Sequence, residues 1–380
     1  MLSLPLFDKG AGTILVTEGN GVVSYRVAAK LMAAGYPTVR IGVPTDPSTS
    51  VEKLRELGAE VVAFDWDKEE TFNDALKGVK SVFIAMPHHK NWEAMFTAFL
   101  TKAKAAGVKN LCKLSFYHAL ASKADTMTSF DTATRIDDPF LEIPFVLMHR
   151  ECDRKIMKTS HMTLNYAILF ASHFMSNPIV YQSESLRTEH KFYGASNGKG
   201  INYVSPNDVA EVAVRALLAP ADHHRVGYTL TGPTTITDHE VAVLLGQRLN
   251  APVTYVDRPL QEYAKTVASG TDWGPSSDVA TLEYVKATGF EEVMPISKDV
   301  DKVCGHPAET YEEYLLAQDA MSDREIEFLR LGGFVSEVDV SEAHVSEVDV
   351  SEVDVSEVDV PKVDVSEVDV PKVDVSESEC

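Results

Sequence analysis

The chain has 380 residues, a formal net charge of −22 and 44% hydrophobic residues. That apolar content is ample for a sizeable core in one or two domains. The charge is uneven, because residues 331–380 hold 15 acidic and 2 basic residues, which leaves 42 acidic and 33 basic residues in the rest. Such an acidic chain is unsuited to a polyanion, so nucleic acid is excluded as a partner.

No apolar stretch reaches the roughly 18–20 residues that span a bilayer, and residues 1–11 have no basic region followed by a long apolar one. The cysteines are widely spaced and include no C-x-x-C pair; they are Cys112, Cys152, Cys304 and Cys380. This spacing argues against a disulfide framework or a zinc site. We therefore expect a cytoplasmic protein with no membrane partner and no metal.

In chain order, the first element pair lies in residues 13–35 (TILVTEGNGVVSYRVAAKLMAAG). Ile14, Leu15 and Val16 form the short apolar run of a strand buried on both faces, and Val23 and Val27 begin a helical repeat after the glycine turn. A strand, a glycine turn and a helix in immediate succession predict the opening of a dinucleotide-binding βαβ unit, with the pyrophosphate on the free N–H groups of the helix.

The same alternation continues downstream. Apolar runs predict strands at 38–43, 60–64, 81–85, 109–114 and 164–170, and helical patterns lie near 50–57, 69–77, 91–106 and 148–159. Strands separated by helices imply a parallel sheet with right-handed crossovers. The fold class is therefore α/β, a Rossmann-like doubly wound parallel sheet that spans residues 12–170 after an N-terminal leader of residues 1–11.

The remainder divides into two regions. Residues 171–330 are expected to form a smaller C-terminal, substrate-covering region, in which 203–232 returns to the sheet through a helix over 207–218. Residues 331–380 repeat S-E-V-D-V with a period of five. Because this period matches neither strand nor helix and the repeats are rich in carboxylates, we expect a disordered acidic tail, either solubilising or bound to a protein partner.

The glycine turn departs from the usual G-x-x-G-x-x-G spacing. Glu18 and Ser24 stand at the first and last glycine positions, and Gly21 keeps the middle one. A carboxylate at Glu18 would repel phosphates, whereas Ser24 costs only a slightly wider approach of helix and strand. The residues alone therefore allow a turn that binds a nucleotide or one that has lost this affinity.

Four longer segments share a pattern that covers about residues 12–320. They are GAEVVAFDWDKEETFNDALKGVKSVFIAMP (58–87), FASHFMSN (170–177), YVSPNDVAEVAVRALLAP (203–220) and GYTLTGPTTITDHEVAVLLGQRLNAPVTYVDRPLQEY (227–263). In this order they resemble the NmrA-like family of atypical short-chain dehydrogenases, and most of all reductases of the festuclavine-dehydrogenase type. The family's T-G-A-T-G-x-x-G turn aligns with residues 17–24.

The resemblance implies a set of cofactor contacts at the ends of the first, third, fourth and fifth strands. Residues of the first turn would surround the pyrophosphate, Asp65 and Trp66 would lie near the adenine, Met86 and Pro87 near the nicotinamide ribose, and Ser115 near the nicotinamide. The turn residues are Thr17, Gly19, Asn20, Gly21, Val22 and Val23. For Trp66 and Met86, ordinary packing in the core is an equal alternative.

The end of the second strand decides between the two nicotinamide cofactors. An acidic residue there would hold the ribose hydroxyls of NAD, and an arginine would meet the 2′-phosphate of NADP. Neither stands at the end itself, but Arg40 lies on this strand and Thr45 and residues 48–50 offer hydroxyl groups. This pattern favours NADP(H) over NAD(H), unless Arg40 is only an exposed side chain of the sheet.

Ordinary short-chain dehydrogenases use a Tyr-x-x-x-Lys pair to exchange a proton with a carbonyl oxygen. None of the 13 tyrosines in this chain has a lysine four residues later. Candidate proton donors are Ser115, Tyr117 and His118 around the end of the fifth strand, and His149 with Asp153 on the following helix. Each histidine could instead be a surface or hydrogen-bonded side chain, and His88-His89 lacks a third placed ligand for a metal.

Two functions from different classes follow. The first is an NAD(P)H-dependent reductase that transfers hydride to a small electron-poor acceptor, such as an iminium, a quinone or an enone, because these acceptors need less acid assistance. The second is a non-catalytic sensor whose nucleotide occupancy alters contacts with a protein partner. The eroded turn favours the sensor, and the intact substrate region favours the enzyme.

Overall fold

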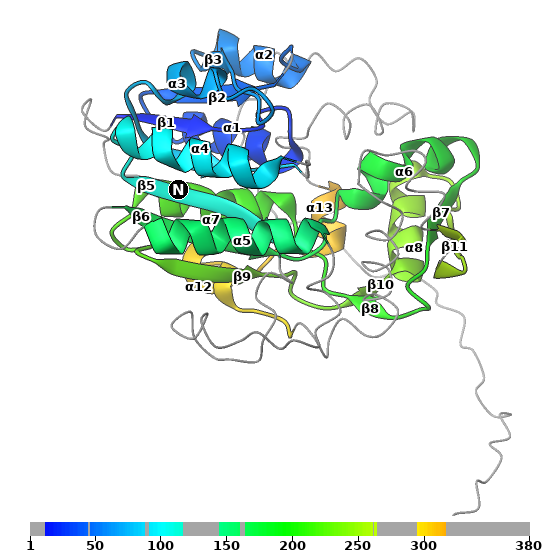
Figure 1. The fold of residues 1–380 in the computed structure, drawn as a ribbon. Helices are drawn as coiled ribbons and strands as arrows, with labels where there is room; N and C mark the ends of the chain where they lie inside the picture. Colours follow the sequence, from blue (N-terminus) through cyan, green and yellow to red (C-terminus); the bar gives the residue numbers. More distant parts are fainter. Residues whose placement is uncertain are drawn as a thin grey trace, which may run out of the picture. The chain divides into compact units, whose positions relative to one another are not determined.

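The computed structural model describes residues 12–44, 46–87, 91–116, 144–159, 164–260, 262–263 and 295–316. A seven-stranded sheet forms the centre, and all of its neighbouring strands are parallel, in the order β3-β2-β1-β4-β5-β6-β9 (Figure 1). Its strands are β1 (Thr13–Val16), β2 (Val39–Val43), β3 (Glu60–Ala63), β4 (Val79–Ile84), β5 (Asn110–Phe116), β6 (Asn165–Ala171) and β9 (Val226–Leu230).

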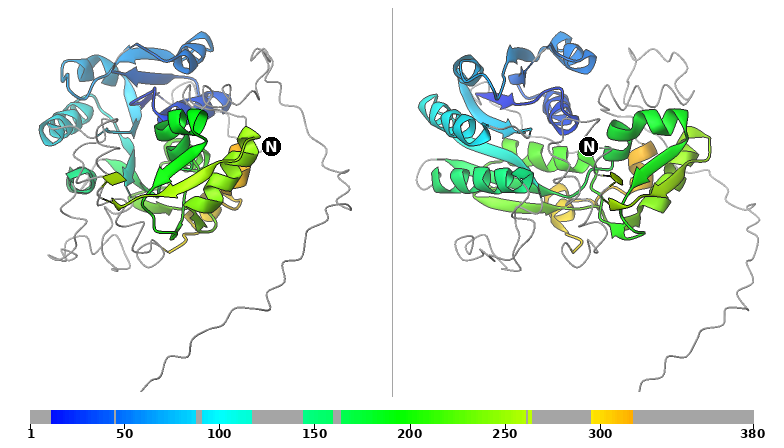
Figure 2. Two further views of the ribbon diagram at one scale, coloured as in Figure 1. Left: turned by 90° about the vertical axis from the view of Figure 1, so that its right-hand side faces the viewer. Right: turned by 45° about the vertical axis from the view of Figure 1, so that its right-hand side comes forward.

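Helices cover both faces of this sheet (Figures 1 and 2). One face packs against α1 (Val22–Ala33), α2 (Thr49–Glu56), α7 (Pro206–Leu218) and α12 (Asp299–Cys304). The other packs against α3 (Thr71–Leu76), α4 (Trp92–Ala105) and α5 (Pro144–Thr159). The strand order reverses between β1 and β4, which confirms the predicted Rossmann-like, doubly wound class.

The apolar run of β1 shows why this sheet is buried on both sides. Ile14 and Val16 pack into the layer under α1 and α7, whereas Leu15 packs into the opposite layer under α3 and α4. Successive side chains of a strand point to opposite faces, so a strand between two helical layers requires apolar residues at every position. All three side chains are fully buried.

Aromatic rings dominate the layer under α3 and α4. Phe64 and Trp66 follow β3, Phe72 lies on α3, and Phe96 and Phe99 lie on α4. The Phe64 and Phe72 rings stack at 5.2 Å, and Phe99 meets both edge-on at 5.8–5.9 Å. This cluster joins the β3–α3 connection to α4 and thereby fixes the carboxyl end of β3.

A third hydrophobic cluster has its own smaller elements, built from segments that follow β6 and β9. These elements are α6 (Asn177–Thr188), β7 (Lys191–Gly194), β8 (Gly200–Ile201), β10 (Ile236–Thr237), α8 (Asp238–Leu249), β11 (Thr254–Asp257) and α13 (Tyr311–Leu316). The Tyr311 hydroxyl donates to the Met175 carbonyl at 2.6 Å and so joins α13 to the segment after β6. The boundaries proposed for a substrate-covering region remain a prediction.

One helix, α6, was not predicted from the sequence. Asn177-Pro178 begins α6, where Pro178 occupies the first turn, a position at which proline's missing N–H costs nothing. The backbone leaves helical geometry at Gln182, whose side-chain amide instead bonds both backbone polar groups of Tyr193 on β7. This interruption, together with the polar composition, hid the helix from a reading by apolar periodicity.

Several predicted features lie outside the described residues. They are the leader of residues 1–11, Thr45, His88-His89, Tyr117, His118, residues 264–294 of the expected substrate-covering region and the acidic tail of residues 331–380. Within the described part of the chain, no helix combines the length and apolar character needed to cross a membrane.

Truncation of the aromatic cluster tests its structural role. Phe72→Ala should lower the free energy of unfolding by about 3–5 kcal/mol, because the substitution leaves a cavity among fully buried rings. Leu57→Ala is the matched control: Leu57 is 74% exposed, and its loss should change stability by less than about 0.5 kcal/mol. Urea denaturation followed by circular dichroism measures both, and equal small effects would show that the cluster is not a packed core.

Candidate functional site

The site lies where the strands end. In a parallel sheet all carboxyl ends lie along one edge, and ligands bind in the crevice at the point where the strand order reverses. Here that point lies between β1 and β4, with β5 next to β4. The glycine turn after β1 and the end of β5 therefore lie on the same edge of the sheet.

The turn after β1 is closely packed. Glu18 adopts a left-handed backbone conformation with φ of 53°, and the Gly21 N–H donates to the Glu18 carbonyl at 2.8 Å. The Gly19 N–H donates to the Gly42 carbonyl of β2 at 2.8 Å. A Cβ on Gly19 would lie 2.2 Å from Ile41 Cγ2, so only glycine fits at this position.

The start of α1 is suited to an anion. Gly21 is its N-cap and has no side chain to occupy the N–H groups of the first turn, which contains no acidic residue. A helix N-terminus with free N–H groups favours phosphate. Asn20 ties the turn to the loop after β2, because its side-chain amide donates to the Asp46 carbonyl at 3.2 Å and accepts from the Ser48 N–H at 2.9 Å. These residues fit a pyrophosphate.

Thr17 and Trp66 both bond the end of β4. Thr17 Oγ1 accepts from the Ala85 N–H at 2.9 Å, and Trp66 Nε1 donates to the Ala85 carbonyl at 3.0 Å. The Trp66 indole is 2% exposed, and Met86 is 5% exposed with its Sδ 4.0 Å from Cys152 Sγ. Both side chains belong to the core, as the packing alternative in the sequence analysis allowed. Contact of their backbone with a cofactor stays a prediction. Contact of the exposed Pro87 with a cofactor also stays a prediction.

Glu18 carries less charge than its residue type suggests. Burial, reinforced by the neighbouring carboxylate Asp65, raises the pKa of Glu18 to about 7. Asp65 itself pairs with Lys68 at 2.8 Å. At neutral pH a substantial fraction of Glu18 is therefore protonated and uncharged. The repulsion between Glu18 and a phosphate is then weaker than a fully ionised carboxylate would produce.

Arg40 requires a correction. Its guanidinium donates to the carbonyls of Ala75 and Lys77 at 2.7 Å and pairs with Glu60 at 2.9 Å. The end of α3 leads directly into β4, so these carbonyls lie at the amino edge of the sheet, opposite the glycine turn. Arg40 caps α3 and does not make the 2′-phosphate contact that we expected. Its place on β2 was correct, but the direction of its side chain was not readable from the sequence.

A buried polar cluster lies between β5 and α5. Lys113 and Ser115 are two residues apart on β5 and share a face, and His149 and Asp153 are four apart on α5 and share the facing side. Ser115 Oγ donates to Asp153 Oδ2 at 2.5 Å, and Lys113 Nζ contacts Asp153 Oδ1 at 2.8 Å. Lys113 Nζ also donates to His149 Nδ1 at 3.1 Å and to the Leu114 carbonyl at 3.3 Å.

The Lys113 ammonium thus pairs with one carboxylate and donates to two further acceptors, which accounts for a charged group that is 1% exposed. Because an ammonium only donates, His149 Nδ1 is the acceptor and a neutral His149 carries its proton on Nε2. Complete burial raises the pKa of the Asp153 carboxyl, while Lys113 and Ser115 oppose this shift.

Aromatic rings border the outer end of this cluster. The Phe145 ring lies 4.6 Å from the His149 ring and 5.5 Å from the Phe116 ring, and His173, just after β6, lies 5.9 Å from Phe116. Phe116 and Phe145 are half-buried. Two expected residues, Ser115 and His149, therefore come together, with Asp153 between Ser115 and Lys113.

Sequence reasoning missed Lys113. In a strand a lysine usually signals an exposed position, and the run KNLCKL was read only as apolar. The usable signal was its spacing: Lys113 shares a strand face with Ser115, and Asp153 is the acid that a buried lysine needs. Tyr117 and His118 lie outside the described residues and stay predictions, as does a protein partner for the tail.

Comparison with known proteins defines the class. Residues 19–220 match the NAD(P)H-binding family, to which this chain belongs. The chain is 26% identical over 307 residues to an NAD(P)H azoreductase of Xenophilus azovorans, covering 81% of this chain and 98% of the relative. It is 23% identical over 304 residues to a festuclavine dehydrogenase of Aspergillus fumigatus, covering 77% of this chain and 93% of the relative.

The fold has the same kind of relatives. An NADPH-dependent quinone oxidoreductase of Escherichia coli, solved with NADPH, superposes with a TM-score of 0.61 and 21% identity over 80% of this chain and 98% of that one. The resemblance to NmrA-like, atypical short-chain dehydrogenases is confirmed, and the chain is an oxidoreductase with a nicotinamide cofactor. The enzyme is thus favoured over the non-catalytic sensor.

The Glu18 carboxyl predicts a pH-dependent affinity. Nucleotide binding should weaken by up to about tenfold between pH 6 and pH 8, because the ionised carboxylate that forms around pH 7 repels the pyrophosphate. Glu18→Gln should bind equally well at both pH values. Fluorescence titration of NADPH measures this, and an affinity of the unaltered protein that does not change with pH would contradict the placement of Glu18 beside the phosphates.

Proposed function

We propose that this protein is a reductase that transfers hydride from NAD(P)H to a small electron-poor organic acceptor, such as an iminium, a quinone or an enone. The observation that carries the proposal is the Lys113–Asp153–Ser115 cluster, which stands on β5 and α5 in place of a Tyr-x-x-x-Lys pair. Bound NAD(P)H would supply the hydride. The relatives named as an azoreductase and a festuclavine dehydrogenase support acceptors other than a simple carbonyl.

The cluster gives the protein a route for a proton. When Asp153 is protonated, its carboxyl donates to Ser115 Oγ, and the Ser115 hydroxyl hydrogen is free to turn toward an acceptor at the carboxyl edge. Burial favours this protonated form because it raises the pKa of Asp153. Lys113, which also contacts His149, holds the Asp153 carboxyl in position beside Ser115. A quinone or an enone takes both a hydride and this proton, whereas an iminium takes only the hydride.

The borders of the cluster suit a flat acceptor. The half-buried Phe116 and Phe145 rings offer apolar surface beside Ser115, and aromatic groups pack against such rings in stacked or edge-on geometry. The His173 ring, at the start of the segment that follows β6, adds a polar group to this surface. We therefore place the acceptor between Ser115 and these rings.

We propose NADP(H) as the cofactor. The support for this choice comes from the loop between β2 and α2, because Arg40 does not point toward the cofactor edge. Ser48 caps α2 by accepting from the Val51 N–H, and Thr49 is exposed at the first position of this helix. Hydroxyl groups at a helix N-terminus suit a phosphate.

We place the enzyme in the cytosol, because the described cysteines Cys112, Cys152 and Cys304 are all free thiols.

Cofactor selectivity and the correction of Arg40 can be tested together. Arg40→Met should lower the free energy of unfolding by about 2–3 kcal/mol through lost bonds to the α3 carbonyls. It should leave the ratio of NADPH to NADH affinity unchanged, with NADPH tighter in both proteins. Titration with each nucleotide and urea denaturation provide the two readouts. Tighter NADH binding in the unaltered protein would refute NADP(H), and a ratio that falls in the variant would return Arg40 to the 2′-phosphate.

The proposed proton route predicts a split between acceptors. Ser115→Ala and Asp153→Asn should lower kcat for a quinone or an enone by about 10²–10⁴-fold, the usual contribution of general acid catalysis. An iminium should be reduced at a nearly unchanged rate, because it needs no proton. The loss of absorbance of the reduced nicotinamide during steady-state oxidation of NADPH measures each rate.

Ser81→Ala is the matched control for these variants. Ser81 is a buried serine on β4 that accepts from Asn110 at the amino end of β5, far along the strand from Ser115. It should reduce all acceptors at the unaltered rate. Equal losses for the iminium and the quinone in Ser115→Ala would contradict the proton route, even if hydride transfer itself is confirmed.

A further inference from the structure

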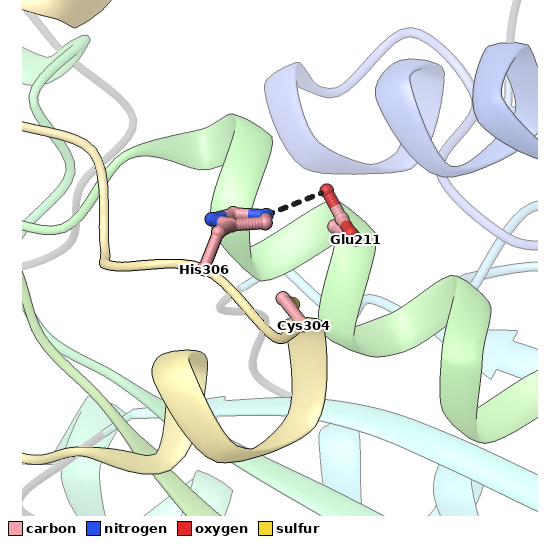
Figure 3. Close-up of side chains that lie close together, drawn as sticks. All are labelled: Glu211, Cys304 and His306. Atoms are coloured by element: carbon pink, nitrogen blue, oxygen red, sulfur yellow. Dashed lines mark hydrogen bonds and ion pairs between the residues drawn. The ribbon is translucent and has the colours of Figure 1, made fainter. Parts of the chain in front are cut away.

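Three side chains of different chemistry converge away from the cofactor edge. Glu211 lies on α7, Cys304 is the last residue of α12, and His306 follows two residues later. One potential ligand atom from each, a carboxylate oxygen, a thiol sulfur and an imidazole nitrogen, lies within 4.8 Å of the others. Figure 3 shows the three side chains gathered between α7 and the segment that follows α12.

The histidine is oriented as a ligand. His306 Nδ1 lies 2.8 Å from the Pro307 carbonyl, which only accepts, so Nδ1 carries the ring proton. The Nε2 lone pair of a neutral His306 then faces Glu211 Oε2 at 3.4 Å. Either a proton on Nε2 or a metal ion bound to both groups would fill the gap between them. A bond from the second ring nitrogen to a backbone carbonyl is the arrangement that orients histidines in metal sites.

The carboxylate is held in the same way. Arg215 donates to Glu211 Oε1 from Nη2 at 2.8 Å and from Nε at 3.2 Å, so Oε2 is the oxygen that remains on the His306 side. The same Arg215 donates to the Cys304 carbonyl at 3.0 Å and fixes the end of α12 against α7. Arg215 thus positions two of the three groups.

We propose that Glu211, Cys304 and His306 form a binding site for a divalent metal ion of borderline softness, of which Zn²⁺ is the best fit. Zinc takes sulfur, nitrogen and carboxylate oxygen together in a tetrahedron whose ligand atoms are about 3.5 Å apart. The Glu211–His306 distance is close to this value, and each distance to the Cys304 sulfur needs to shorten by at most about 1.3 Å.

The surroundings of the three side chains give an ion access from solvent and balance its charge. The His306 side chain is 46% exposed and that of Glu211 25%, whereas Cys304 is buried, so the site opens to solvent on one side. One thiolate and one carboxylate neutralise a divalent ion, so the nearby Lys30 and Arg215 are not opposed by an excess positive charge. The fourth position of the tetrahedron is left for water.

Such a site would hold the C-terminal part of the sheet together. The segment it anchors also reaches the sheet through Asp299, whose carboxylate accepts from the Thr229 N–H of β9 at 2.9 Å. The Glu309 N–H donates to Asp208 on α7 at 2.8 Å. The ion would therefore join α7 to the segment that follows α12, and this role is independent of the reductase reaction.

Cobalt is the direct probe, because Co²⁺ bound to a thiolate gives an intense near-ultraviolet charge-transfer band. The full-length protein, freed of metal with a chelator, should bind one equivalent of Co²⁺ with this band, and Zn²⁺ should displace the ion. Cys304→Ser should lose the band, and Glu211→Gln and His306→Gln should each weaken binding at least about tenfold. His224→Gln, which removes an exposed histidine from a turn, should bind as the unaltered protein does.

Each other outcome overturns the proposal. No charge-transfer band in the unaltered protein would mean that the three side chains form only an ion pair between Glu211 and a protonated His306. A band that persists in Cys304→Ser would assign the metal to another cysteine. Circular dichroism of each variant shows that it is folded, and a rise in melting temperature with Zn²⁺, absent in Cys304→Ser, gives a second readout that does not depend on enzymatic activity.

Discussion

The ion pair between Lys113 and Asp153 determines how β5 and α5 meet. Both groups are within 1% of complete burial, and a buried charge is stable only when an opposite charge and hydrogen bonds surround it. Lys113 comes from the strand and Asp153 from the helix, so neither element can shift along the other without leaving a charge unpaired. Ser115 and His149 are positioned by the same pair, and with them the wall of the site.

The parallel sheet brings this pair to the same edge as the glycine turn. The turn keeps the features that a pyrophosphate requires, namely a closely packed Gly19 and an uncapped helix start, although Glu18 replaces a glycine. Burial of Glu18 against Asp65 compensates in part, because it raises the pKa of Glu18 to about 7 and so removes part of the negative charge. We therefore expect the departure from the family's turn to change how binding depends on pH more than it changes the fold.

More of the fold than of the site could be predicted from the sequence. Apolar runs such as Ile14–Val16 predict strands because a sheet covered on both faces leaves no polar alternative, and the six strands predicted in this way agree with β1 to β6 within about two residues. The helix α6 was not predicted, because a proline such as Pro178 occurs both in turns and in the first turn of a helix. Arg40 was misjudged because sequence position gives the strand but not which neighbour the side chain contacts. For the same reason Trp66 was left open between core packing and contact with the cofactor. The role of Lys113 could not be predicted without knowing that α5 packs on β5. This packing places Asp153 next to Lys113.

A structure of the complex with NADP(H) tests the central claim most directly. The pyrophosphate should lie on the first-turn N–H groups of α1, and the nicotinamide ring should lie beside Ser115, with space for an acceptor between the ring and Phe116. A nicotinamide that lies away from β5, or a nucleotide held elsewhere than at the turn after β1, would contradict it. In that case the Lys113–Asp153 pair would hold the fold together and take no part in the reaction.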